Sequence, residues 1–147
     1  MKHLMIGVCM AALGATTALA QDMVTYTTDQ SFADVTFGLE NAIVGEGLVI
    51  DATSYVGDML ERTKADVGSD VTIFLNANVY SFCSAALSRK VMEINPMNLI
   101  YCPYGIFVAQ SPDTPDQTMI GYRSFPEGEM KEGEALLDSI TRTAIGQ

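Results

Sequence analysis

The feature that most constrains the fold is an apolar stretch in the middle of the chain, YSFCSAALSRKVMEINPMNLIYCPYGIFVAQ, at Tyr80–Gln110. Its first half places apolar side chains on one side of a helical wheel; these are Cys83, Leu87, Val91 and Ile94. After a turn at Asn95-Pro96, the second half alternates as a β-strand, and one face holds Cys102, Tyr104, Ile106 and Val108. A helix packed on a strand in this order brings the two cysteines together in the core.

The first twenty residues have the layout of a secretory signal peptide. A basic start at Lys2 precedes an apolar segment over Leu4–Leu13, and Ala18-Leu19-Ala20 is a small-residue cleavage signature. The apolar segment is short for a bilayer span of about 20 residues. We therefore expect export to the periplasm with cleavage after Ala20, which leaves residues 21–147 as a single domain.

The charge of the mature domain restricts its partners. Removal of Lys2 leaves 7 basic and 18 acidic residues, a formal net charge of 7 − 18 = −11. Such a charge disfavours binding to nucleic acid and to anionic membrane surfaces. We expect the partner to be an unknown small molecule or a periplasmic protein.

The absence of histidine excludes several chemistries. Processing removes His3, the one histidine of the chain, and also Cys9. Ser–His and Cys–His nucleophile pairs are then impossible, as are imidazole zinc sites and c-type haem attachment. The sequence predicts no catalytic residue, no cofactor and no metal ligand, and it favours a non-catalytic role over an enzymatic one. Catalysis by carboxylates alone stays open.

The rest of the chain alternates between strand and helix patterns. Strands are expected at Met23–Thr28, Leu48–Ser54, Val71–Tyr80 and Thr118–Phe125, besides the one that starts at Cys102. Helices are expected after an N-cap at Ser31, over Tyr55–Val67 and over Met130–Ile145, besides the central one. This order best fits an α+β domain, in which helices pack on one face of a mostly antiparallel sheet.

The central residues also resemble a known family. FCSAALSRKVMEINPMNLIYCPYGIFV at Phe82–Val108, GYRSFP at Gly121–Pro126 and MLERTKADVG at Met59–Gly68 resemble the domain of unknown function 302. The resemblance spans about residues 31–126. It implies a compact α+β domain similar to the TATA-binding-protein fold, with no assigned function and no implication for DNA. Ser84-Ala85 replaces the Asn-Pro pair that follows the first cysteine in the family, whereas Cys102-Pro103 matches its strand start.

The mature domain keeps two cysteines, Cys83 and Cys102. In an oxidising compartment an even pair is typical of a disulfide. This one would close a loop of about 20 residues, worth roughly 3 kcal/mol. Two alternatives stay open: a pair of buried reduced thiols, and a redox or metal role. Six surviving methionines leave a soft-metal (copper) carrier as the weakest reading; they are Met23, Met59, Met92, Met97, Met119 and Met130.

The polar residues near the central stretch suggest a binding site. Arginines are well suited to carboxylates and oxyanions, although surface salt bridges are the simpler explanation in so acidic a chain. We predict a concave sheet face or helix–sheet cleft near Asn76, Asn78, Tyr104 and Arg123, with Ser84, Ser88 and Arg89 of the central helix as further candidate ligand-binding residues. The resulting prediction is a non-catalytic small-ligand binding or accessory module, stabilised by a Cys83–Cys102 disulfide. The alternative, from another class, is a periplasmic thiol redox protein.

Overall fold

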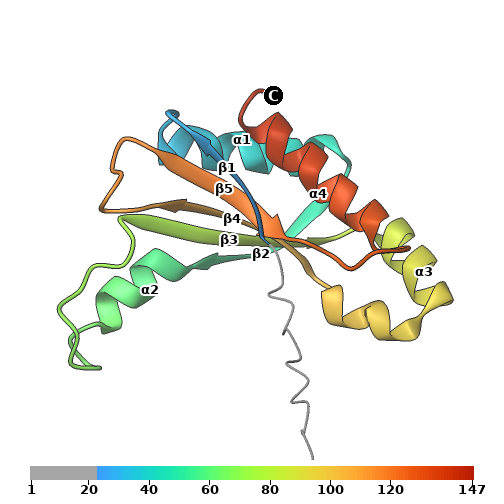
Figure 1. Cartoon of the computed structure of the whole chain (residues 1–147), viewed down its shortest axis with the longest axis horizontal. Helices are drawn as coiled ribbons and strands as arrows, with labels where there is room; N and C mark the ends of the chain where they lie inside the picture. The colour runs from blue at the N-terminus through green and yellow to red at the C-terminus, as the bar shows by residue number, and fades with distance from the viewer. Residues whose placement is uncertain (1–22) are drawn as a thin grey trace, which may run out of the picture.

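The computed structural model describes residues 23–147, so the predicted signal peptide, with His3 and Cys9, lies outside the described residues. One five-stranded sheet has the order β1-β5-β4-β3-β2, and all neighbouring strands are antiparallel. The strands are β1 (Met23–Thr28), β2 (Val49–Tyr55), β3 (Asn76–Cys83), β4 (Tyr104–Gln110) and β5 (Thr118–Arg123). With the helices, this sheet forms the α+β class that was predicted (Figure 1).

Four α-helices and one 3-10 helix accompany the sheet within these residues. They are α1 (Phe32–Gly45), α2 (Val56–Thr63), α3 (Ala85–Ile94), η1 (Pro96–Tyr101) and α4 (Lys131–Ala144). The predicted N-cap of α1 is confirmed, because the Ser31 hydroxyl accepts a hydrogen bond from the backbone amide of Asp34 at 3.1 Å. None of the helices of residues 23–147 is both long and apolar enough to cross a membrane.

Helices α1 and α4 cover one face of the sheet and enclose the core (Figure 1). Alternation along the strands sends every second side chain toward these helices; the buried ones include Tyr80, Phe82, Tyr104, Ile106, Val108 and Ile120. The helices contribute residues at helical spacing, namely Val35, Leu39, Ile43, Leu137 and Ile140. Burial of each such aliphatic side chain contributes about 1.5–3 kcal/mol, so this layer supplies most of the hydrophobic stabilisation.

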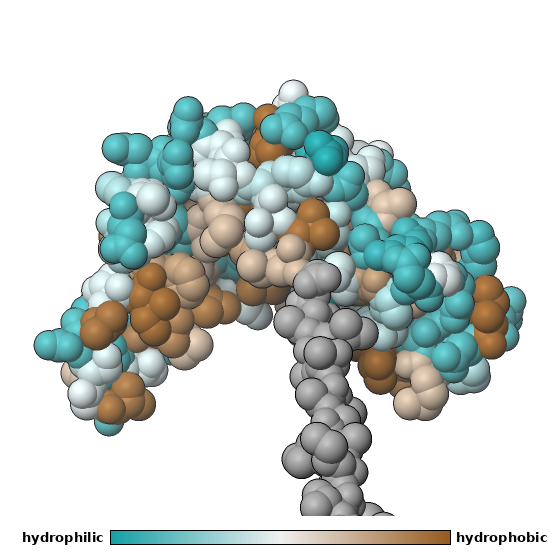
Figure 2. Space-filling model, in the orientation of Figure 1, coloured by the Kyte–Doolittle hydropathy of each residue, from teal (hydrophilic) through white to brown (hydrophobic). Residues whose placement is uncertain are grey.

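The opposite face of the sheet is only partly covered. Helix α2 and the loop at residues 64–75 lie below one end of the sheet in Figure 1, and α3 and η1 lie at the other end. Figure 2 shows apolar surface on both of these arms. The exposed apolar side chains include Val67, Val71, Ile73 and Leu75 on the first arm, and Met97, Leu99 and Ile100 on the second. Within residues 23–147, the sheet between the arms therefore has an open, concave face.

The central stretch differs from the prediction at its first cysteine. Cys83 is the last residue of β3, where it pairs with Val49, and does not lie on a helix. Helix α3 begins later because Ser84 is its N-cap and accepts the backbone amide of Leu87 at 3.4 Å. Cys102 caps the end of η1 and precedes β4. The predicted burial of Leu87 is confirmed, whereas Ile94 is 62% exposed.

The strand predicted at Val71–Tyr80 begins only at Asn76. Asn76 pairs with Gln110, the last residue of β4, and residues 111–117 that follow Gln110 form a loop. A strand needs a neighbour for its backbone hydrogen bonds, so the alternating segment before Asn76 has no continuous partner. Its apolar residues remain exposed; they are Val71, Ile73 and Leu75.

Candidate functional site

A groove with a volume of 310 Å³ lies on the open face of the sheet, beside η1. The strands contribute its floor, and the wall comes from η1 and the segment after β5. The floor residues are Val79, Ser81, Gly105 and Phe107, with Arg123 as the charged group; the wall residues are Ile100, Tyr101, Pro103 and Phe125. Small-molecule sites are concave and mostly apolar, with a few polar groups, and this groove has that composition.

The strand register places three of these residues in one row. Ser81 of β3 pairs with Gly105 of β4. The β4–β5 ladder pairs Ile106 with Tyr122, so the next position brings Gly105 beside Arg123. Neighbouring strands lie about 4.8 Å apart, so Ser81 and Arg123 flank Gly105 with their backbones about 10 Å apart.

Gly105 has no side chain, so the centre of this row presents only backbone. A Cβ at this position would meet the Cγ1 of Val79 at 3.8 Å, an ordinary van der Waals distance. A glycine inside a strand costs about 0.5–1 kcal/mol relative to alanine and often marks a close approach by another molecule. Gly121 is different, because its Cβ would lie 2.4 Å from the Val24 carbonyl oxygen and 2.9 Å from the Phe107 ring. The first glycine opens the groove, and the second serves internal packing.

An aromatic chain connects the wall of the groove to the core. The ring centroid of Tyr101 lies 5.2 Å from that of Phe125, which in turn lies 5.9 Å from that of Tyr104. Tyr104 then meets Phe82 edge-on at 6.4 Å. Tilted and edge-on aromatic pairs contribute about 0.5–1.5 kcal/mol beyond their buried area. The wall is therefore anchored to the core.

The buried Asn98 fixes the position of η1 itself. Its side-chain amide donates to the Val91 carbonyl of α3 at 2.9 Å and to the Glu129 carboxylate at 3.0 Å. The same hydrogen bond from Asn98 holds the pKa of Glu129 below its usual range. The Asn98 side chain thus connects η1 both to α3 and to the segment before α4. These two contacts fix the part of the groove wall that η1 forms.

Arg123 is the cation available to a ligand in the groove. It makes no salt bridge and no side-chain hydrogen bond with any of residues 23–147. Most other cations of this part of the chain have acidic partners; the pairs are Lys64–Glu61, Arg89–Glu93, Lys90–Glu132, Lys131–Glu134 and Arg142–Asp138. Arg62 of α2 also lacks such a pair among the described residues, but it does not line the groove.

The predicted asparagines lie away from the groove, at the other end of β3. The side-chain amide of Asn76 donates to the Gln110 side chain at 2.9 Å, and that of Asn78 donates to the Tyr80 hydroxyl at 3.4 Å. Both occupy the strand positions that alternate with Val79, so they are on the face that α1 and α4 cover. The structure does not bring them together with Arg123.

The remaining predicted site residues surround the start of α3. Ser84 caps that helix, Ser88 lies against Cys102, and Arg89 is exposed and paired with Glu93. Tyr104 is 1% exposed, and its hydroxyl has no hydrogen-bond partner within the described residues. Burial is the main cause that raises the pKa of this tyrosine.

The sequence reasoning missed Gly105 and Phe107 of the groove. Their signal was already in the pattern of β4. Because Tyr104, Ile106 and Val108 face the core, the alternating positions must face the opposite side of the sheet. What the pattern did not indicate is that, among residues 23–147, helices cover that side only in part.

The two cysteines lie close together, as the sequence predicted. Their Sγ atoms are 3.8 Å apart, both thiols are free and half-buried, and the Ser88 hydroxyl lies 3.3 Å from the Cys102 sulfur. Burial first, and the hydrogen bond to Cys102 second, raise the pKa of the Cys83 thiol. Because the thiolate is the reactive form, a raised pKa makes this cysteine a poor nucleophile at neutral pH.

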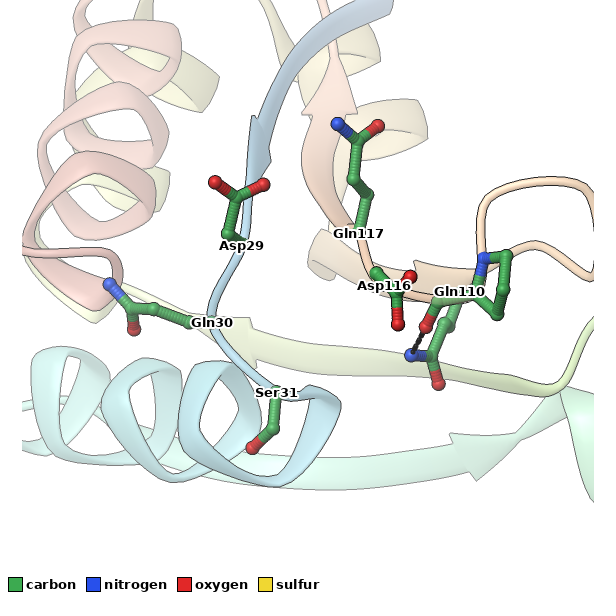
Figure 3. A pocket seen from close by; sticks show the side chains of 7 residues that line it. Asp29, Gln30, Ser31, Gln110, Asp116 and Gln117 are labelled. Carbon is green, nitrogen blue, oxygen red and sulfur yellow. Dashed lines mark hydrogen bonds between the residues drawn. The ribbon is translucent and has the colours of Figure 1, made fainter.

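A second recess, of 490 Å³, lies between two turns (Figure 3). Asp29, Gln30 and Ser31 line it from the turn before α1, and residues of the β4–β5 loop line it from the other side. Its side chains are largely exposed, and several already have partners: Gln30 donates to the Ile145 carbonyl, and Gln110 donates to the Pro115 carbonyl. Residues 23–147 contain no group of three His, Cys, Asp or Glu side chains placed to hold a metal ion. The recess therefore has no feature that singles out a ligand.

The comparison with solved structures supports the fold. The crystal structure of an uncharacterized conserved protein DUF302 from Bacillus stearothermophilus matches this chain with a TM-score of 0.58 and 18% sequence identity. The match covers 86% of this chain and 89% of the other. No family model matches the sequence, and no curated protein does. The predicted resemblance to the domain of unknown function 302 is therefore confirmed at the level of the fold.

Proposed function

We propose that this chain is an exported periplasmic domain that binds a small molecule in the groove of its open sheet face and performs no catalysis. The observation that carries this proposal is the 310 Å³ groove, with its apolar wall and its row of Ser81, Gly105 and Arg123. Cavities of this size suit small molecules, and the aromatic wall supports a preformed site.

The lining of the groove supports a binding role rather than an enzymatic one. Its polar side chains are Ser81, Tyr101 and Arg123, and no acidic residue of the described part of the chain lines it. Activation of a serine nucleophile requires an adjacent base. The groove thus provides contacts for a ligand but no general base.

Blocking the floor of the groove tests this proposal. Gly105→Val should lower the affinity for N-phenyl-1-naphthylamine, an uncharged probe that fluoresces in apolar sites, by roughly tenfold, equivalent to about 1.4 kcal/mol. The valine suits a strand and meets little at this position, where a Cβ would lie 3.8 Å from Val79. The readout is a fluorescence titration of the folded variant.

A matched control is Ala52→Val. Ala52 pairs with Ser81 on β2 but does not line the groove, so probe affinity should remain that of the parent. Equal affinities of Gly105→Val and the parent would show that the probe, if it binds, does so elsewhere, and the groove would lose its role.

We further propose that Cys83 and Cys102 form a disulfide in the periplasm. Thiols whose sulfurs lie 3.8 Å apart need only a small shift to reach the bond length of about 2.05 Å. Cys83→Ser or Cys102→Ser should therefore lower the free energy of unfolding by about 2–5 kcal/mol in oxidising buffer. The control is the same set in reducing buffer, where the parent should lose this advantage. Variants that match the oxidised parent would refute the bond.

The short distance between the two sulfurs also supports a second candidate function, that of a thiol redox protein. The reduction potential of the Cys83–Cys102 pair distinguishes a structural disulfide from a redox-active one. A structural disulfide lies below about −300 mV, whereas a working one lies well above it. The raised pKa of Cys83 favours the structural reading, so we expect the lower value in a titration against dithiothreitol. A potential near −200 mV would instead support redox exchange.

A further inference from the structure

Charge is the first indication of which ligand the groove takes. The mature domain has a formal net charge of 7 − 18 = −11, so its surface repels anions in general. Within the described residues, the groove nevertheless has one cation, Arg123, and no carboxylate in its lining. A guanidinium without an acidic partner in residues 23–147 is placed to pair with an anionic group that enters from solvent.

Shape is the second indication. The floor at Gly105 is bare backbone, between the Ser81 hydroxyl of one neighbouring strand and Arg123 of the other. A bare strand backbone presents a flat surface, and the ring of Phe107 continues the same face one pleat further along β4. A flat ring system therefore makes more contact with this floor than a branched or flexible chain does.

The wall is the third indication. Tyr101 and Phe125 line the groove together and are anchored to the core through Tyr104. Aromatic side chains prefer offset-stacked or edge-on contacts with other rings, so this wall adds a preference for aromatic ligands. The volume of 310 Å³ limits the ligand to a small molecule.

From these three features we infer that the ligand of the groove is a planar aromatic anion, such as an aromatic carboxylate or sulfonate. Its ring system lies on the floor at Gly105, and its charged group pairs with Arg123. This inference rests on the proposed binding function and specifies the class of ligand.

Two probes that share the same rings but differ in charge distinguish the contribution of charge to the affinity from that of shape. 8-Anilinonaphthalene-1-sulfonate and N-phenyl-1-naphthylamine differ only in the sulfonate. The parent should bind the sulfonate probe about fivefold more tightly, as expected for one partly exposed ion pair. Arg123→Gln should abolish this preference, so that the ratio of the two probe affinities falls to about one. Arg123 is exposed, so the variant should fold, which near-UV circular dichroism checks.

Arg62→Gln is the matched control for charge. Arg62 is the other arginine without an acidic partner among the described residues, and it lies on α2 outside the groove. This variant has the same net charge as Arg123→Gln and should keep the full preference for the sulfonate probe. If the two variants behave alike, the preference comes from net charge, and the pairing with Arg123 is wrong.

Competition tests the planar part of the inference. 2-Naphthalenesulfonate should displace the bound probe at a concentration about tenfold lower than 1-octanesulfonate, which has the same charge without rings. Equal potency would overturn the aromatic preference. If the uncharged probe binds as tightly as the sulfonate probe but Gly105→Val still blocks both, the groove keeps its binding role and only the ligand class is wrong.

Discussion

At the scale of single residues, Asp138 connects three partners through its carboxylate. Its carboxylate on α4 accepts hydrogen bonds from the hydroxyls of Tyr26 on β1 and Tyr122 on β5, and from Arg142 at 2.9 Å. The Arg142 guanidinium also lies 4.5 Å from the centre of the Tyr26 ring. Burial alone would raise the pKa of Asp138, but these hydrogen bonds lower it below its usual range. One carboxylate therefore joins the edge of the sheet to the last helix.

Asp138→Asn should lower the free energy of unfolding at pH 7 by about 1–2 kcal/mol, because hydrogen bonds to a charged acceptor are stronger than those to a neutral one. The folded pKa lies below the unfolded value of about 3.9. The charged form therefore stabilises the fold fully above about pH 5, and this contribution is lost as the pH falls through the folded pKa.

Denaturant titrations at pH 7, 5 and 3 measure this effect. The difference between the parent and Asp138→Asn should be constant between pH 7 and 5 and should shrink toward pH 3. Asp113→Asn, in the exposed β4–β5 loop, should differ little from the parent at any pH. A parent–variant difference that persists unchanged at pH 3 would show that the asparagine acts through packing and not through charge.

At the scale of elements, the contact between α1 and α4 depends on one glycine. A Cβ at Gly38 of α1 would lie 2.3 Å from the backbone carbonyl oxygen of Ala144 on α4. Such a distance is below any van der Waals contact, so the two helix backbones approach closely only because this side chain is absent. The same helix ends with Gly45, where a Cβ would meet nothing within 4 Å.

These two glycines form a matched pair for mutation. Gly38→Ala should lower the free energy of unfolding by about 1–3 kcal/mol, since the added methyl group forces the helices apart. Gly45→Ala should instead raise it by about 0.4–1 kcal/mol, because alanine reduces the freedom of the unfolded chain. Thermal melting of both variants gives the comparison. A stabilised Gly38→Ala would mean that α4 shifts without cost.

At the scale of the whole molecule, helices α1 and α4 are concentrated on one face of the sheet, and the opposite face lies between two arms (Figure 1). Both arms expose apolar side chains (Figure 2). Exposed apolar groups that gather on one side of a small domain are typical of interaction surfaces. This arrangement gives the groove one open side toward solvent.

Export is a property of the whole chain, and the intact mass of the mature protein tests it. Protein purified from the periplasm should begin at Gln21, so its intact mass should equal that of residues 21–147, two hydrogens lighter if Cys83 and Cys102 are joined. The motivating observation is the segment that ends in Ala18-Leu19-Ala20. A mass that still includes His3, or a mature protein confined to the cytoplasm, would contradict the prediction.

The sequence alone was sufficient for the fold class and for the order of the elements. Apolar residues repeat at helical spacing in α1, as at Val35 and Leu39, and alternate in β4, as at Ile106 and Val108; all four are buried. These periods depend only on backbone geometry. These periods also predicted that Cys83 and Cys102 lie close together. Cys83 nevertheless ends β3 and does not lie on a helix, because Ser84 caps α3 and delays its start.

Only the tertiary structure decided which face of the sheet stays open among residues 23–147, and therefore where the groove lies. Strand alternation separates Gly105 and Phe107 from Tyr104 and Ile106, but the pattern is the same whether or not a helix covers the second face. The row of Ser81, Gly105 and Arg123 joins residues of three strands that lie 105 − 81 = 24 and 123 − 105 = 18 positions apart in the sequence. Such a row depends on strand order and register, which arise from long-range packing and not from any local preference.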